Sequence, residues 1–134
     1  MTGLPPRPGM ASHFGITIIS AEKDRLVGEI MADERHLNAI GILHGGAQMA
    51  FADDLGGSLA GLNLASGMRT TTIESKTNFF RAGRPGRIRG VSVPLHVGRR
   101  TIVLQTSIYD SDDRLLAIVT QTQLVLPRDP APPV

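Results

Sequence analysis

Most of the chain from residue 14 onward consists of short stretches in which apolar and polar residues alternate, as in half-buried β-strands. Residues 14–22 and 25–33 are two such stretches, and the Lys23-Asp24 turn between them predicts a β-hairpin. Four later stretches also predict strands, at residues 70–80, 86–97, 101–110 and 115–126. The turn sequence Ser-Asp-Asp-Arg at residues 111–114 joins the last two as a second hairpin.

One long segment has helical spacing instead. From His44 to about Leu64, apolar residues recur three or four positions apart, at Ala47, Ala50, Phe51, Leu55, Leu59 and Leu62. The segment is rich in Gly and Ala, whose small side chains let a helix lie close against a sheet. The element order β-β-α-β-β-β-β predicts an α+β fold with one long helix and a mostly antiparallel sheet.

Length and composition predict a single domain over residues 11–127, with flexible tails at residues 1–10 and 128–134. Seven of the nine prolines lie in residues 1–8 and 127–134, which is typical of chain ends outside the packed domain. There is no cysteine, which excludes disulfides, thiolate metal sites and a cysteine nucleophile. The first residues lack the apolar stretch of a signal peptide, and no apolar run is long enough to span a membrane. We therefore expect a cytoplasmic protein that does not bind a membrane.

The net charge of +2 is unevenly distributed. Residues 75–109 contain no Asp or Glu and carry +7, so the rest of the chain carries −5, because +2 minus +7 is −5. The segment is either a solvated basic face or a binding region for an anion, such as nucleic acid or a phosphorylated small molecule. Aromatic residues make up only 4% of the chain and no DNA-binding motif is present, so we do not expect a nucleic-acid partner.

The candidate chemistry lies around the start of the predicted helix. Gly45 and Gly46 fall where backbone N–H groups have no partner inside a helix, so they either bind an oxyanion or only shape a tight turn. Asp53 follows within the helix and is a candidate base or nucleophile, unless it and Asp54 are two solvent-facing acids. No serine elbow, phosphate-binding loop or histidine pair with metal-ligand spacing is present, so we expect no metal and no cofactor.

The spacing of these residues predicts an oligomer. Gly45 and Asp53 are eight residues apart, which corresponds to about 12 Å along a helix axis. An aspartate side chain is too short to act on a carbonyl held at Gly45 of its own chain. If both residues serve one reaction, the carboxylate comes from a second copy, and the protein is an obligate dimer.

The sequence also resembles a known family. The pattern N-x-x-G-x-x-H-G-G-x(6)-D from Asn38 to Asp53, followed by Thr72-Ile73-Glu74 and by Asn78-Phe79-Phe80-Arg81, is similar to the hotdog-fold acyl-CoA thioesterases. The likeness is greatest to the phenylacetate-degradation (PaaI-like) branch, which includes 4-hydroxybenzoyl-CoA thioesterases, and it extends from about residue 14 to 126. It implies a long central helix wrapped by a curved antiparallel sheet, in dimers and often in tetramers.

The resemblance also implies roles for single residues. Gly45 corresponds to the position whose backbone N–H contacts the thioester carbonyl, and Asp53 of the facing subunit to the nucleophile or the base for water. Asn38 corresponds to a position that holds the water or the carbonyl, and His44 to one near the thioester. Gly46 lies beside this donor. Thr72 corresponds to a hydroxyl that orients the attacking water.

Thr71 is the neighbouring hydroxyl, and the sequence leaves both open as the match to that position. The resemblance also implies a ligand for the basic segment, because coenzyme A carries phosphates, which arginine binds well. Its candidate contacts are Arg81, Arg99 and Arg100. The coenzyme A would be part of the substrate, not a cofactor.

Two alternatives belong to other classes of function. A hotdog hydroxyacyl thioester dehydratase needs a catalytic histidine in a loop together with a helix acid, and His13-Phe14-Gly15 faintly resembles that loop. A non-catalytic acyl-CoA-binding protein would keep the pocket without needing Asp53. The acyl group itself is either aromatic or of medium chain length.

Overall fold

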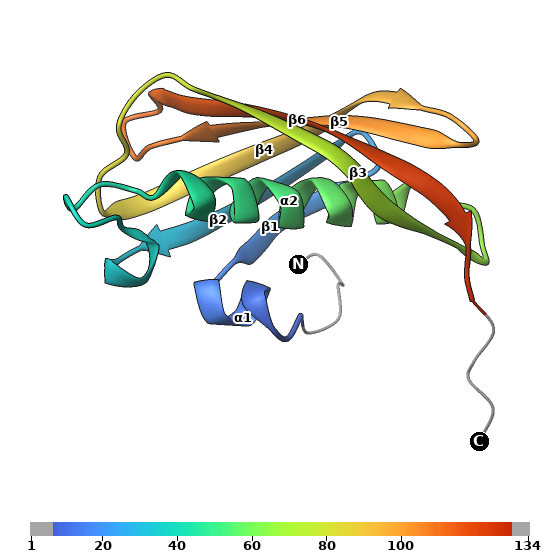
Figure 1. Ribbon diagram of the computed structural model, residues 1–134, viewed down its shortest axis with the longest axis horizontal. Coiled ribbons are helices and arrows are strands. Elements are labelled where there is room, and N and C mark those ends of the chain that lie inside the picture. The colour runs from blue at the N-terminus through green and yellow to red at the C-terminus, as the bar shows by residue number, and fades with distance from the viewer. Residues whose placement is uncertain (1–6, 130–134) are drawn as a thin grey trace.

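One long helix, α2 (Gly45–Leu62), lies against a curved six-stranded sheet in the computed structural model, which describes residues 7–129 (Figure 1). The strands are β1 (Thr17–Glu22), β2 (Arg25–Ala32), β3 (Met68–Phe79), β4 (Gly86–Val97), β5 (Thr101–Tyr109) and β6 (Leu115–Pro127). They pair antiparallel in the order β1-β2-β4-β5-β6-β3. This arrangement confirms the predicted α+β fold, with one helix wrapped by an antiparallel sheet.

Two short helical elements were not predicted, α1 (Met10–Phe14) and the 3-10 turn η1 (Glu34–His36). Helix α1 has five residues, too few to show a repeating apolar pattern, and it takes Met10 from the predicted tail and Phe14 from the predicted first strand. It ends at Gly15, whose φ of 69° lies in the left-handed region that favours glycine. Residues 1–6 and 130–134 of the predicted tails lie outside the described residues. No helix within residues 7–129 is long and apolar enough to cross a membrane.

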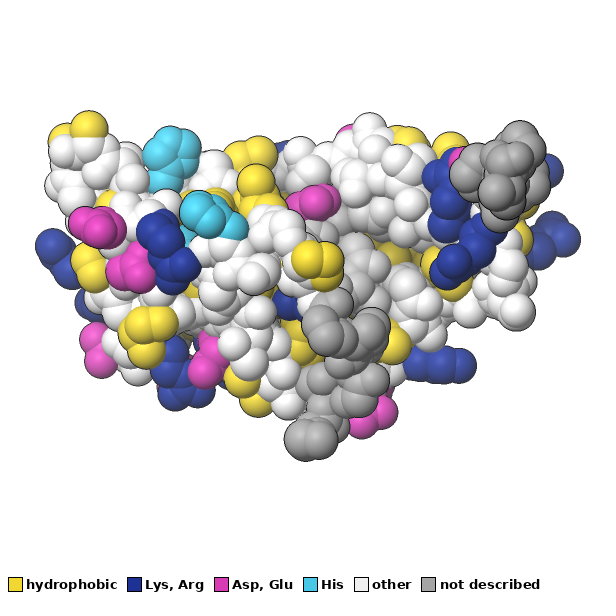
Figure 2. Space-filling view, turned by 90° about the horizontal axis from the view of Figure 1, so that it is seen from below, with side chains coloured by type: hydrophobic (Ala, Val, Ile, Leu, Met, Phe, Trp, Pro, Cys, Tyr) yellow, Lys and Arg dark blue, Asp and Glu magenta, His cyan; other side chains and the backbone are white. Residues whose placement is uncertain are grey.

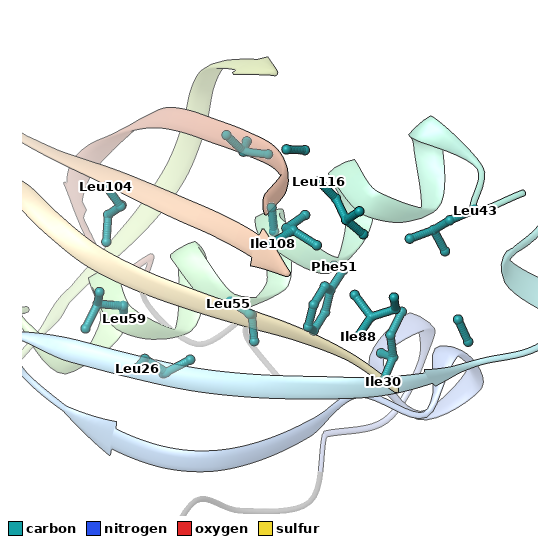
Figure 3. Close-up of a cluster of buried hydrophobic side chains, with 14 of the residues drawn as sticks. Leu26, Ile30, Leu43, Phe51, Leu55, Leu59, Ile88, Leu104, Ile108 and Leu116 are labelled. Carbon is teal, nitrogen blue, oxygen red and sulfur yellow. The ribbon is translucent and has the colours of Figure 1, made fainter. Parts of the chain in front are cut away.

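The hydrophobic core fills the space between α2 and the sheet (Figure 3). Phe51, Leu55 and Leu59 of α2 are fully buried. They belong to one cluster with sheet residues, among them Leu26, Ile30, Ile88, Leu104, Ile108 and Leu116. Burying each such side chain contributes about 1.5–3 kcal/mol to folding, so the core holds the helix and its functional residues in one position.

Glycines in the sheet let α2 approach closely. Gly28 of β2 and Gly90 of β4 are directly opposite each other in the ladder. A Cβ atom at Gly28 would lie 2.5 Å from a methyl carbon of Leu55, and one at Gly90 would lie 2.4 Å from another. Both distances are too short for any real contact, so the pair forms a depression into which Leu55 packs.

Strand β3 forms one edge of the sheet and contains a bulge at Ile73. Thr72 is opposite Gln123 of β6, but Glu74 is opposite Thr122, so Ile73 is an extra residue in the ladder. In a regular strand, residues 72 and 79 would face opposite sides of the sheet because their spacing is odd. The bulge reverses this, and both Thr72 and Phe79 face α2.

Candidate active site

The loop before α2 is held by its own side chains. Asn38 Oδ1 accepts hydrogen bonds from the N–H groups of Ile40 and Ile42, at 3.1 and 3.3 Å. The Asn38 N–H in turn donates to the Ile42 carbonyl at 2.8 Å. Because Oδ1 is occupied in this way, the amide orientation is set and Nδ2 is the group that Asn38 can offer to a ligand.

Buried His36 holds the same loop in place through hydrogen bonds of its ring and its backbone. Its Nδ1 accepts from the Asp33 N–H at 3.1 Å, its Nε2 lies 2.8 Å from the Phe14 carbonyl, and its own carbonyl accepts from the His44 N–H at 2.7 Å. A side-chain hydrogen bond from Arg35 lowers the pKa of Asp33, so the aspartate that caps this turn stays ionised. His36 is therefore a structural histidine that fixes where α2 begins.

His44 caps α2 with its side chain. Its Nδ1 accepts a hydrogen bond from the Gly46 N–H at 2.8 Å, so in the neutral ring the proton is on Nε2. A Cβ at position 46 would lie 2.9 Å from Nδ1, which explains the glycine. The Gly46 N–H is thus engaged within the chain. The N–H groups of Gly45 and Ala47 form no hydrogen bond within residues 7–129, and of these two residues Gly45 is the one that lines a pocket.

A pocket of about 390 Å³ opens beside Gly45. Asn38, Gly45, Gln48, Phe79, Phe80 and Arg81 are among the residues that line it. Phe79 packs closely on the helix start, since a Cβ at Gly45 would lie 3.1 Å from its ring. None of the described residues around this pocket is acidic. The pocket therefore combines hydrogen-bond donors with apolar walls, but it has no carboxylate of its own.

Asp53 does not line this pocket and lies on the side of α2 that faces β3. Its Oδ1 accepts a hydrogen bond from the Thr72 hydroxyl at 3.3 Å, and Thr72 Oγ1 accepts from Gln123 Nε2 at 2.7 Å. The Asp53 side chain is exposed in the single chain. Thr72, and not Thr71, is the hydroxyl that the structure brings to this carboxylate.

Comparisons with known proteins agree with this geometry. Residues 40–117, more than half of the chain, match the family model described as the thioesterase superfamily. The chain belongs to the thioesterase superfamily. It is 36% identical to the 1,4-dihydroxy-2-naphthoyl-CoA hydrolase of Escherichia coli over 77% of this chain and 76% of that protein. It is 34% identical to the proofreading thioesterase EntH of Cronobacter sakazakii, over 78% and 77%.

Solved structures show the same fold. A thioesterase from Haemophilus influenzae superposes with a TM-score of 0.84 at 27% identity, covering 87% of this chain and 82% of that chain. A phenylacetic acid degradation-related protein from Ralstonia eutropha gives 0.84 at 26% identity, covering 91% and 93%. These matches confirm the hotdog fold, and the relatives' names support thioester hydrolysis as the reaction of this enzyme.

The thioesterase does not bring its three candidate arginines together within one chain. Arg81 lines the pocket at Gly45, but Arg99 lines another pocket near the C-terminal end of α2, beside Asn63 and Leu64. Arg100 adjoins Arg99 in the turn between β4 and β5. Figure 2 shows basic side chains near both ends of the face seen from below. The contacts of these arginines with coenzyme A stay predictions.

Part of the basic segment is neutralised by pairing. Arg87 forms an ion pair with Glu29 at 2.8 Å, and Arg89 forms one with Asp113 at 3.0 Å while its guanidinium lies over the Tyr109 ring. The run of arginines in the sequence therefore overstates the positive charge that this region offers to a ligand.

Sequence reasoning missed two polar residues of the thioesterase. Gln48 lines the Gly45 pocket and is 3% exposed, and Gln123 is 2% exposed beneath Thr72. Gln48 is in an apolar helix face and Gln123 in an alternating strand, so the only signal was a polar side chain at a position that the pattern assigns to the core.

Proposed function

We propose that this thioesterase hydrolyses acyl-CoA, and that each active site is formed by two subunits. The Gly45 N–H of one subunit would bind the thioester oxygen, and Asp53 of the other would act as nucleophile or as the base for water. One observation carries this proposal. The pocket at Gly45 has no carboxylate among its described lining residues, while Asp53 faces another side of the same helix.

The chemistry follows from the charges that develop. Attack on the thioester carbonyl places negative charge on its oxygen, and the Gly45 N–H and Asn38 Nδ2, which belong to residues that line the pocket, would donate hydrogen bonds to it. His44 is not among the residues that line the pocket, and we propose that its Nε2–H lies near the bound thioester. Collapse of the intermediate breaks the C–S bond, so water is consumed and a carboxylic acid and the thiol of coenzyme A are released. No cofactor is needed for this reaction.

Strand β3 supports the dimer. It is an edge strand, so one side of its backbone has no partner within the described chain. Its exposed apolar side chains include Ile73 and Phe79, at 56% and 50%, and Phe80 follows at 58%. Pairing of β3 with β3 of a second copy would cover these groups. We propose that the protein is a dimer of this kind or a dimer of two such dimers.

The substrate is proposed from the pocket and from the relatives. Phe79, Phe80 and Ile42 provide apolar walls that suit an aromatic or a medium-chain acyl group. The Escherichia coli relative is named for an aromatic acyl-CoA, and the Ralstonia eutropha structure for phenylacetic acid degradation. Arg81, Arg99 and Arg100 are the proposed contacts of the coenzyme A phosphates, with the arginines at the two helix ends supplied by different subunits.

Subunit complementation tests the shared site. Gly45→Pro removes the donor N–H at the first helical position, where proline is tolerated, and His44 already has the extended backbone that precedes proline (φ −65°, ψ 134°). Asp53→Asn removes the carboxylate. Each variant alone is expected to be nearly inactive. When the two are co-expressed, random pairing leaves about a quarter of the sites intact, so about a quarter of the wild-type rate should return.

Thiol release from several acyl-CoAs is the measurement. If the co-expressed variants stay as inactive as each one alone, or if an active monomer is found by light scattering, the shared site is wrong. Tight binding of acyl-CoA without thiol release would indicate a non-catalytic binding protein. Addition of water to an enoyl thioester without thiol release would indicate a dehydratase.

A further inference from the structure

Gln123 is a buried glutamine whose side chain makes one hydrogen bond within residues 7–129, and the reaction described so far does not use it. It lies on β6, is 2% exposed, and is directly opposite Thr72 in the ladder. Its Nε2 donates to Thr72 Oγ1 at 2.7 Å. A buried amide is costly unless it is hydrogen-bonded, so a specific contact is needed to explain a glutamine at this core position.

The contact with Gln123 determines what the Thr72 hydroxyl does. A hydroxyl has a single proton to donate, and here one of its lone pairs is taken by the Gln123 amide. The proton is then left for Asp53 Oδ1, at 3.3 Å. That distance is long for an O–H···O bond, and catalytic hydrogen bonds commonly shorten when substrate binds.

The three side chains thus form one directed series, from Gln123 to Thr72 to Asp53. With Oδ1 held by Thr72, Oδ2 is the oxygen left to act on water or on the thioester. We infer that Gln123 is a positioning residue for hydrolysis, acting on Asp53 through the Thr72 hydroxyl. This inference rests on the proposed role of Asp53.

Gln121 provides a matched control on the same strand. It is fully buried two residues away and faces α2 as Gln123 does, but neither amide atom has a hydrogen-bond partner within the described residues. It packs against Gly56, where a Cβ would lie 2.4 Å from its Oε1. A variant at Gln121 therefore reports what disturbing a buried glutamine does to folding, without touching Thr72.

The first test replaces each glutamine by methionine, which has a similar shape and no donor. Gln123→Met is expected to lower kcat by about 10-fold or more while KM changes little, because the carboxylate loses its orientation. Gln121→Met is expected to keep kcat within about two-fold. Melting temperatures of both variants show that the folded protein is being compared. Equal kcat values for the two variants would overturn the inference.

A double-mutant cycle tests whether Gln123 acts through Thr72. Thr72→Val removes the hydroxyl and is expected to lower kcat about as much as Gln123→Met. The double variant should then be no slower than Thr72→Val alone, since the same interaction is lost once. Effects that multiply in the double variant would show that Gln123 acts by another route.

Gln123→Glu provides a variant that keeps the polar side chain if Gln123→Met does not fold. An ionised glutamate only accepts hydrogen bonds, so it would draw the Thr72 proton away from Asp53. When protonated, it can donate again. The rate of Gln123→Glu divided by the wild-type rate should therefore rise as the pH is lowered, and a ratio independent of pH contradicts the inference.

The same assay separates this inference from the proposed function. If wild type releases thiol and Asp53→Asn does not, the role of Asp53 stands and the Gln123 variants test the positioning role alone. If Asp53→Asn is as active as wild type, the proposed function fails whatever the glutamines do.

Discussion

Asp53 and Asp54 are adjacent on α2 but contact different parts of the chain. Asp53 accepts from Thr72 on the edge strand, whereas Asp54 forms an ion pair with Arg7, ahead of α1. Neighbouring residues on a helix point about 100° apart, and this is enough to give the two carboxylates separate environments. One faces the side where a second subunit would lie, and the other fastens the N-terminal segment to the helix.

This difference leads to the first prediction. Asp53→Asn is expected to lower kcat by at least about 10²-fold, because the base or nucleophile is lost while the side chain keeps its size. Asp54→Asn should leave kcat nearly unchanged and cost at most about 1 kcal/mol of stability through the partly exposed Arg7 pair. Thiol release and thermal unfolding measure the two effects. An inactive Asp54→Asn beside an active Asp53→Asn would reverse the assignment.

The second prediction concerns the donor at the helix start. Gly45→Pro should lower kcat by about 10²–10³-fold, the usual loss for one oxyanion donor. Gly45→Ala is the control, since it adds a Cβ at the same place, 3.1 Å from the half-exposed Phe79 ring, but keeps the N–H. It should lose far less activity. Similar losses in both variants would mean that the ring contact, and not the N–H, is what matters.

A third prediction compares the effect of alanine on stability at two glycines of α2. Gly56→Ala would put a methyl group 2.4 Å from Gln121 Oε1, so we expect a loss of about 1–3 kcal/mol in the free energy of unfolding. Gly61→Ala meets nothing within 4 Å and should stabilise the helix by about 0.5–1 kcal/mol. Urea unfolding measures both changes. A stable Gly56→Ala variant would show that Gln121 can move.

The fourth prediction tests the phosphate contacts. Replacing Arg99 and Arg100 together by alanine should raise KM for acyl-CoA and leave kcat largely intact, because such contacts bind the ground state and the transition state alike. A truncated thioester without the nucleotide serves as the comparison, and its KM should not change. An equal loss on both substrates would make these arginines structural.

A fifth prediction follows from the turn between β5 and β6. A backbone hydrogen bond from Arg114 is the largest cause that lowers the pKa of Asp110 below its ordinary value of 3.8. A carboxyl whose pKa is lower in the folded than in the unfolded protein stabilises the fold at pH values above its unfolded-state pKa. This stabilisation is lost as the pH falls through the folded-state pKa. Asp110→Asn should therefore be less stable than wild type at pH 7, with the difference shrinking below about pH 4. Unfolding curves of both proteins at pH 7 and below about pH 4 check this.

The sequence by itself determined the six strands, the long helix and the place of Gly45 at the start of that helix. Apolar residues alternate in the strands and recur at helical spacing from residue 44, because each element must bury one face. Asn38, His44 and Gly45 are close in the chain, and local hydrogen bonds shape the Asn38 turn and cap the helix start in the structure. The eight-residue spacing to Asp53 was likewise readable, since helix geometry converts it directly into a distance.

Only the tertiary structure decided what meets Asp53. With the bulge at Ile73, the side chain that reaches Asp53 is that of Thr72 and not that of Thr71. The sequence cannot show this, because a one-residue change in strand register moves every side chain to the other face of the sheet while the order of residues stays the same. Gln123 reaches Thr72 only because β6 pairs with β3, which is 51 residues away in the chain. The charges of Arg87 and Arg89 are reduced by Glu29 and Asp113, partners that pairing between distant segments supplies. These contacts depend on strand order and register, which are set by the packing of the whole sheet around α2 and not by any local run of residues.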